Sequence, residues 1–197
     1  MIKIVFAILS VVASISCFIP YIRDIRKGVT KPHMYSWLIW TILQFTSAII
    51  IFSKGGELGA LSISVGAILC GYIFILSFKN GTRNINLFDK ICFLGSLFAI
   101  SIWLLLDNAL ISVILLSVID FVGFLPTIRK SYFDPNSETA LTYVLSVFSG
   151  AFAIIALSEY SYTTLIYLIS IVITNTLCTT VIVVRRNIIH DSTISRI

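Results

Sequence analysis

The stretch from Cys17 to Trp40 reads CFIPYIRDIRKGVTKPHMYSWLIW, an apolar segment that runs into a proline, a short basic turn and a second apolar segment. The same order returns from Gly123 to Ser146 as GFLPTIRKSYFDPNSETALTYVLS. With Pro20 aligned on Pro126, the residues that pair are Phe18 with Phe124, Ile22 with Ile128, Arg23 with Arg129, Ser36 with Thr142 and Trp37 with Tyr143. This internal repeat predicts a small helical bundle that has been duplicated.

The composition indicates which solvent surrounds these segments. Of 197 residues, 58% are hydrophobic and 12% charged, and the mean hydropathy is +1.02. A soluble domain has about 25% charged residues, so most of this surface is expected to face a lipid bilayer. The net charge of +5 raises the question of nucleic acid as a partner, but the placement of the charges fits membrane orientation better, and no nucleic acid is expected.

The apolar segments are long enough to cross a membrane. A spanning helix needs roughly 20 mainly apolar residues. The predicted spans are 2–22, 34–53, 58–78, 88–106, 109–128, 139–158 and 162–184. The first segment has no cleavage site after it and is expected to remain as the first span.

The orientation follows from the Lys and Arg residues, which mark cytoplasmic loops. Twelve of the 14 fall in the connections after the first, third and fifth spans or in the tail: Arg23, Arg26, Lys27, Lys31, Lys79, Arg83, Lys90, Arg129, Lys130, Arg185, Arg186 and Arg196. The opposite side holds only Lys3 and Lys54. We therefore expect a multi-pass protein of the bacterial inner (plasma) membrane, with its N-terminus outside and its C-terminus in the cytoplasm.

The fold class predicted is an all-α membrane protein with two parallel three-helix bundles. Two three-helix units joined directly would be inverted relative to one another, because three is odd, and an extra span restores the parallel arrangement. The expected units are a first repeat at 1–80, a linker span at 81–107, a second repeat at 108–185 and a cytoplasmic tail at 186–197. Parallel repeats with a site between them at mid-membrane are a known transporter plan.

This topology, with a proline near the cytoplasmic end of the first and fifth spans, resembles the PQ-loop superfamily. The superfamily includes the SWEET sugar transporters, their half-size bacterial relatives and the lysosomal amino-acid exporters. Here Tyr21 and Thr127 follow the two prolines, where the motif that names the family has glutamine, so the subfamily stays open. The resemblance implies a small-molecule transporter that works by alternating access. A monomer already holds both halves, and a homo-oligomer is left open.

The prolines and the arginines after them are the expected moving parts. Pro20 and Pro126 each remove a backbone hydrogen bond and are interpreted as hinges; the alternative is a static kink. Arg23 and Arg129 are interpreted as a cytoplasmic gate that pairs with acids such as Asp24, Asp134 or Glu138. The alternative is that both arginines only fix the topology beside phosphate headgroups.

Asp120 is the acidic residue that lies deep within a predicted span. An ionisable group at that depth is costly and by default marks an ion or substrate pathway. We expect Asp120 to couple transport to protons or to bind a substrate amine, and the lysosomal exporters resemble it in using an intramembrane aspartate. The alternative is a permanently neutral Asp120 bonded to a neighbouring helix. Ser14 holds the equivalent position in the first repeat and is expected to contact substrate.

Three further polar or aromatic residues are expected to bind the solute. Asn175 lies in the last span, close to where the sugar transporters carry a substrate-binding asparagine, although the third span has Leu69 and Cys70 instead. Gln44 both donates and accepts hydrogen bonds, and Trp40 offers a stacking face. Trp37, nearer the basic turn, is expected to anchor at the membrane interface.

Other functions of seven-span proteins are disfavoured by missing residues. The last span has no lysine for retinal, the two histidines lie in polar segments and do not suit haem, and no GxSx nucleophile is present for a rhomboid-type protease. The four cysteines are scattered through apolar segments with no CxxC. No enzyme activity, cofactor or metal is expected. The alternatives kept are an uncoupled sugar facilitator and a non-transporting scaffold or receptor with the same fold.

Overall fold

The computed structural model describes residues 1–103, 105 and 108–194. This part of the chain forms seven α-helices and one short 3-10 helix: α1 (Ile2–Arg26), α2 (Met34–Ser53), α3 (Glu57–Asn80), α4 (Leu87–Trp103), α5 (Ala109–Phe133), η1 (Pro135–Ser137), α6 (Ala140–Ala156) and α7 (Tyr162–Ile194). Within the described residues, α1, α2, α3, α5 and α7 are long and apolar enough to cross a membrane, and α6 is a shorter apolar helix. The all-α class and the membrane-type helices are thus confirmed.

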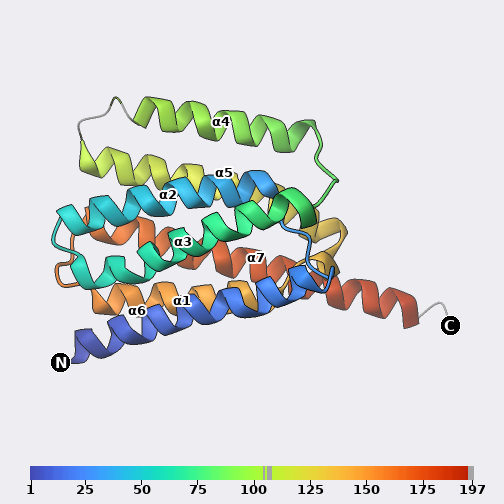
Figure 1. Cartoon of the computed structure of the whole chain (residues 1–197), viewed down its shortest axis with the longest axis horizontal. Helices are drawn as coiled ribbons and strands as arrows, with labels where there is room; N and C mark the ends of the chain where they lie inside the picture. The colour runs from blue at the N-terminus through green and yellow to red at the C-terminus, as the bar shows by residue number, and fades with distance from the viewer. Residues whose placement is uncertain (104, 106–107, 195–197) are drawn as a thin grey trace.

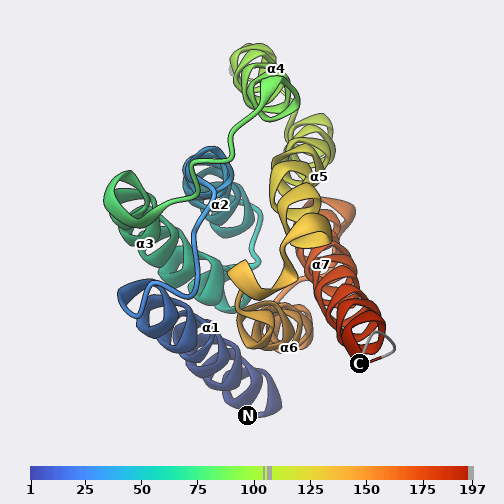
Figure 2. The same cartoon turned by 90° about the vertical axis from the view of Figure 1, so that its right-hand side faces the viewer.

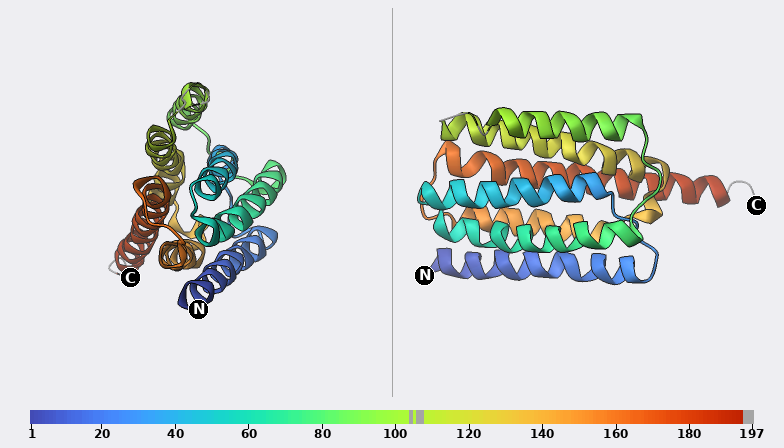
Figure 3. Two further views of the ribbon diagram at one scale, coloured as in Figure 1. Left: turned by 90° about the vertical axis from the view of Figure 1, so that its left-hand side faces the viewer. Right: turned by 45° about the horizontal axis from the view of Figure 1, so that its top comes forward.

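Successive helices run in alternating directions (Figure 1), so α1, α3, α5 and α7 all end on the same side of the molecule. We call this side the basic end, because the described Lys and Arg residues gather there, apart from Lys3 and Lys54. Arg196 lies outside the described residues. The right-hand view of Figure 3 shows α7 extending beyond the other helices at this end.

The helices pack in two groups of three with α4 outside them. Seen end-on in Figure 2, α3 lies between α1 and α2, and α7 packs against both α5 and α6. Between the groups, α1 packs along α6 and α2 packs along α5. α4 packs mainly on α5 and has a smaller contact with α2. The space enclosed by α1, α2, α3, α5, α6 and α7 is where the candidate site lies.

Helices α1 and α5 extend beyond the expected span ends at 22 and 128, to Arg26 and Phe133. Pro20 and Pro126 lie inside α1 and α5 and are buried. Each proline removes only its own N–H from the backbone ladder, and the next turn is bonded again, with Lys27 N donating to Arg23 O at 3.1 Å. α7 likewise continues past its apolar part because Arg185 and Arg186 bond to Tyr132 O and Pro135 O, which tie the helix to the segment after α5.

Candidate binding cavity

A cavity of about 80 Å³ lies among the six inner helices. All the residues predicted to bind solute or protons line it: Ser14, Trp40, Gln44, Asp120 and Asn175. They come from α1, α2, α5 and α7, and packing brings them together from four separate predicted spans. The wall built by α5 and α7 contains the carboxylate, and the wall built by α1, α2 and α3 contains neutral polar groups.

The acidic part of the wall is built around Asp120, which is 3% exposed. Thr174 Oγ1 lies 3.2 Å from Asp120 Oδ2, and it also lies 3.0 Å from Ser170 O and 3.3 Å from Ile171 O. A threonine hydroxyl has one hydrogen to donate, so the backbone of α7 competes with Asp120 for it. On the next residue, Asn175 Nδ2 donates to Ile171 O at 2.8 Å.

The neutral part of the wall holds the predicted counterpart of Asp120. Ser14 Oγ donates to Ser62 O of α3 at 3.1 Å. Gln44 Nε2 donates to Cys70 Sγ at 2.9 Å. This position of the amide depends on Gly66, because a Cβ added there would lie 2.3 Å from Gln44 Oε1. The absence of a side chain at Gly66 therefore leaves room for the Gln44 amide beside α3.

Aromatic rings cover the wall toward the basic end. The ring centroids of Trp40 and Phe124 lie 4.5 Å apart, and those of Trp37 and Trp40 lie 5.0 Å apart with an edge-on geometry. Trp37 is 3% exposed, so the expected interfacial anchor is instead part of the core, because its ring packs against Phe18 and Tyr21 of α1. Among the described residues, buried Trp40 Nε1 and buried Thr142 Oγ1 have no hydrogen-bond partner.

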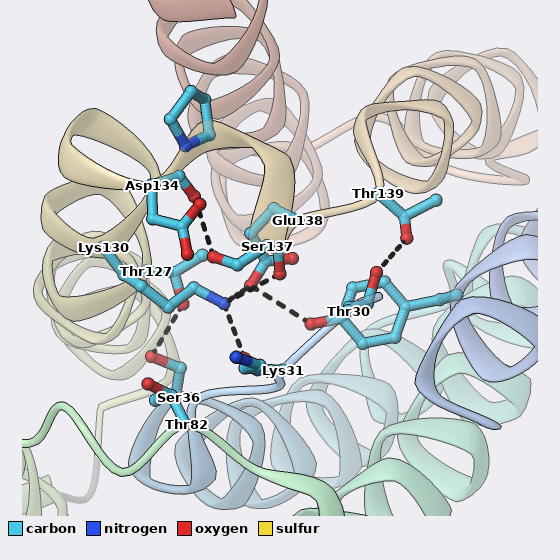
Figure 4. A network of polar contacts seen from close by, with 12 residues as sticks. Thr30, Lys31, Ser36, Thr82, Thr127, Lys130, Asp134, Ser137, Glu138 and Thr139 are labelled. Carbon is cyan, nitrogen blue, oxygen red and sulfur yellow. Dashed lines mark hydrogen bonds and ion pairs between the residues drawn. The ribbon is translucent and has the colours of Figure 1, made fainter. Parts of the chain in front are cut away.

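A buried ion pair lies between this aromatic layer and the basic end (Figure 4). Lys130 Nζ of α5 bonds to Glu138 Oε1, and the two side chains are 3% and 0% exposed. Tyr21 OH donates to Glu138 Oε1 at 3.3 Å, and Tyr143 OH donates to Oε2 at 2.9 Å. Lys130 Nζ also donates to the backbone oxygens of Lys31 and Ser137. We call Lys130, Glu138, Tyr21 and Tyr143 the polar plug; two of its members, Tyr21 and Tyr143, lie in the aromatic cluster around the cavity.

The predicted gate arginines lie outside this plug. Arg129 makes a two-pronged pair with Asp89 of α4, at 3.0 and 2.7 Å, and not with Asp134 or Glu138. Arg23 is exposed and pairs with the adjacent Asp24 at 3.0 Å. The expected partner for Arg129 is therefore corrected: the helix turns the Arg129 side chain toward α4, and the neighbouring Lys130 faces Glu138.

His33 is buried beside the Arg129–Asp89 pair. Its Nε2 lies 3.4 Å from Asp89 Oδ2, without the geometry of a hydrogen bond. Burial lowers the pKa of His33 to about 4; the Lys130 and Arg129 charges act in the same direction, and Asp89 opposes them. The imidazole is therefore neutral near pH 7.

At the opposite end, the cavity is bounded by apolar packing. A Cβ added to Gly59 of α3 would lie 2.5 Å from Leu157 Cδ2 and 3.1 Å from Ala153 O. This close approach of α3 to α6 belongs to a cluster of buried residues that includes Leu43, Ile63 and Leu168. The two ends of the cavity therefore differ: ionic and hydrogen-bonded toward the basic end, and apolar toward the other.

Sequence reasoning missed Lys130 as the partner of Glu138. One signal was available: with the prolines aligned, Lys130 falls on Asp24, so the two repeats carry opposite charges at equivalent positions. Both residues reach the segment before α6, since Thr139 Oγ1 donates to Asp24 Oδ2 at 3.0 Å. The free cysteines expected from the sequence, Cys17, Cys70, Cys92 and Cys178, are all buried and unbridged.

No family model matched this chain, and neither the curated proteins nor the solved structures gave a match.

Proposed function

We propose that this chain is a small-solute membrane transporter of the SWEET/PQ-loop type that works by alternating access. In this proposal seven spans form two parallel three-helix bundles with α4 as the linker, and the basic end faces the cytoplasm of a bacterial cell. The solute is a small polar metabolite such as an amino acid or a sugar. Transport is coupled to protons through Asp120.

The observation that carries the proposal is the cavity itself. It lies between the two helix groups, receives polar side chains from both, and has a buried carboxylate in its wall. A solute pathway needs a polar site at mid-depth that is separated from each face by a layer that can open. The polar plug and the Gly59–Leu157 packing supply two such layers of different chemistry.

The packing order supports the assignment of two repeats. If α1, α2 and α3 correspond to α5, α6 and α7, then the α1–α6 contact corresponds to the α5–α2 contact, and the α3–α6 contact corresponds to the α7–α2 contact; all four are present. The third helix of each group packs against the other two. Such an arrangement is expected of parallel repeats related by an axis along the membrane normal.

The contrast between Ser14 and Asp120 supports coupling at a single position. Both line the cavity, and each contacts the last helix of its own group, Ser14 through Ser62 O and Asp120 through Thr174 Oγ1. Of these two side chains, only the Asp120 carboxyl group can exchange a proton. We assign Ser14, Trp40, Gln44 and Asn175 to solute binding and Pro20 and Pro126 to the bending of α1 and α5.

Reconstitution in liposomes tests this function. Amino acids, sugars and nucleosides are screened for uptake with and without an imposed pH gradient, in the wild type and in Asp120→Asn. We expect uptake of at least one solute, stimulation by the gradient, and loss of that stimulation in the variant. Uptake that is unchanged by both the pH gradient and the substitution would instead indicate an uncoupled facilitator. No uptake of any solute would favour the scaffold alternative.

A further inference from the structure

The cavity wall has a buried carboxylate and no positive side chain to balance it. None of the described residues that line the cavity is Lys, Arg or His. Buried Lys130 lies about 15 Å further along α5 and is already paired with Glu138. A buried carboxylate without a counter-charge is costly, and the one neutral hydroxyl beside it does not supply a charge. Asp120 therefore requires either a bound proton or a cation in the cavity.

No other group among the described residues supplies that charge to Asp120. The titratable groups that face it are the Cys70 thiol of α3 and the Tyr167 phenol of α7. α2 contains no charged residue. The charged residues of α4 are Asp89, which pairs with Arg129, and the exposed Lys90.

The rest of the wall suits a small organic cation. Trp40 and Phe124 are aromatic residues of the cavity wall, and aromatic rings attract ammonium groups. Trp40 Nε1 and Thr142 Oγ1 are buried, unpartnered within the described chain, and belong to residues that line the cavity. A ligand hydroxyl within reach of either atom would satisfy it. A cavity of about 80 Å³ is roughly half the volume of an engineered cavity that holds benzene, which suits a ligand of a few heavy atoms.

We propose that the cavity binds a small organic cation, an ammonium group with a hydroxyl-sized polar substituent, and that this cation and a proton alternate at Asp120. This inference rests on the proposed transport function. When the cation arrives, the O–H bond of the Asp120 carboxylic acid breaks, the proton leaves to solution, and the carboxylate pairs with the ammonium group. The net charge of the occupied site does not change, since one positive ion replaces another. Because one carboxylate does not hold both, transport takes the form of an exchange of cation for proton.

The test uses ethanolamine as the cation, ethylene glycol as its uncharged analogue and glycine as the zwitterion. Binding to the purified full-length protein in detergent is followed in weak buffer with a pH indicator. We expect ethanolamine to bind with release of about one proton, and its affinity to fall about tenfold per pH unit on the acid side. Ethylene glycol should release none. Asp120→Asn should weaken ethanolamine binding roughly 100-fold and abolish the release. Glu57→Gln, which removes an exposed carboxylate at the start of α3, serves as the control and should behave as wild type.

The outcomes separate this inference from the transport proposal. Ethanolamine binding without proton release, or binding that is unchanged in Asp120→Asn, overturns the exchange at Asp120. Uptake of glycine or of a neutral solute into liposomes without ethanolamine uptake overturns the cation class and leaves the transporter proposal intact. No uptake of any solute overturns both. If Asp120→Asn does not fold, the comparison of ethanolamine with ethylene glycol on the wild type decides the question by itself.

Discussion

Glu138→Gln is the substitution that tests whether the polar plug closes the cavity toward the basic end. The carboxylate accepts hydrogen bonds from Lys130 Nζ, Tyr21 OH and Tyr143 OH, and its side chain is fully buried. Glutamine keeps the shape and removes the charge, so the buried Lys130 ammonium is left with neutral acceptors only, the new amide oxygen and the Lys31 and Ser137 carbonyls. Removal of one partner of a buried ion pair costs about 3–5 kcal/mol.

This cost translates into a change in conformational population. The plug joins α5, the segment before α6 and the loop after α1, and it can form only when these elements are together. If the plug is absent from the open conformation, a loss of about 3 kcal/mol raises the open fraction by about 100-fold. Lys130→Met removes the other partner and should act in the same direction. The double variant should have a smaller open fraction than the sum of the two single free-energy effects predicts, because neither charge is then left without its partner.

The native Cys17 provides the readout, because it lines the cavity and is 2% exposed. With the other three cysteines replaced by alanine, its reaction with a membrane-impermeant maleimide is timed in inside-out and right-side-out vesicles. We expect Glu138→Gln to accelerate the reaction from the face that carries the basic end, by tens of times or more, and to leave the rate from the other face unchanged.

The matched control is Asp89→Asn, which breaks the Arg129–Asp89 ion pair at the basic end, between α5 and α4. Since α4 contributes no residue to the cavity wall among the residues described, this variant should leave the Cys17 rate within about twofold of wild type. Equal acceleration in both variants would mean general loosening of the basic end. An unchanged rate in a folded Glu138→Gln protein would refute the role of the plug as a seal.

Two further outcomes are expected. Gly66→Ala should push the Gln44 amide from its place, because the new Cβ would lie 2.3 Å from Gln44 Oε1; we expect a several-fold rise in the transport KM, whereas Gly95→Ala, where nothing lies within 4 Å of the new Cβ, should leave KM unchanged. Burial holds the His33 pKa at about 4, below the value of about 6.5 in an unfolded chain, so the unfolded state binds the proton first as the pH falls. Stability should therefore be fully present above pH 6.5 and decrease toward pH 4, by up to roughly 3 kcal/mol. Unfolding of the detergent-solubilised protein at pH 7.5 and 5.0 should show a smaller decrease in His33→Asn, and an identical decrease would contradict the assignment.

Much of the candidate cavity was predictable because its residues stand out from apolar surroundings. Asp120 was recognisable from sequence because an ionisable side chain within a membrane span is energetically costly and therefore points to a function. Gln44 and Asn175 are recognisable as polar residues within otherwise apolar spans. Trp37 was misassigned, since distance along the chain from a basic turn does not reveal whether a neighbouring helix covers the ring. Phe18 and Tyr21 of α1 pack against the ring and help to bury it.

The sequence by itself determined the all-α class, the apolar helices, the gathering of basic residues at alternate connections and the pairing of the two proline stretches. These depend on composition and spacing, which a single chain displays directly. Only the tertiary structure decided that Lys130 and not Arg129 meets Glu138. Adjacent residues on a helix point about 100° apart, so the neighbours of α5 select which cation is buried: α4 receives Arg129, and the segment that folds back through η1 brings Glu138 to Lys130. The stretch around Pro126 therefore supplies Lys130, the cation of the plug, and the segment after η1 supplies its partner, Glu138.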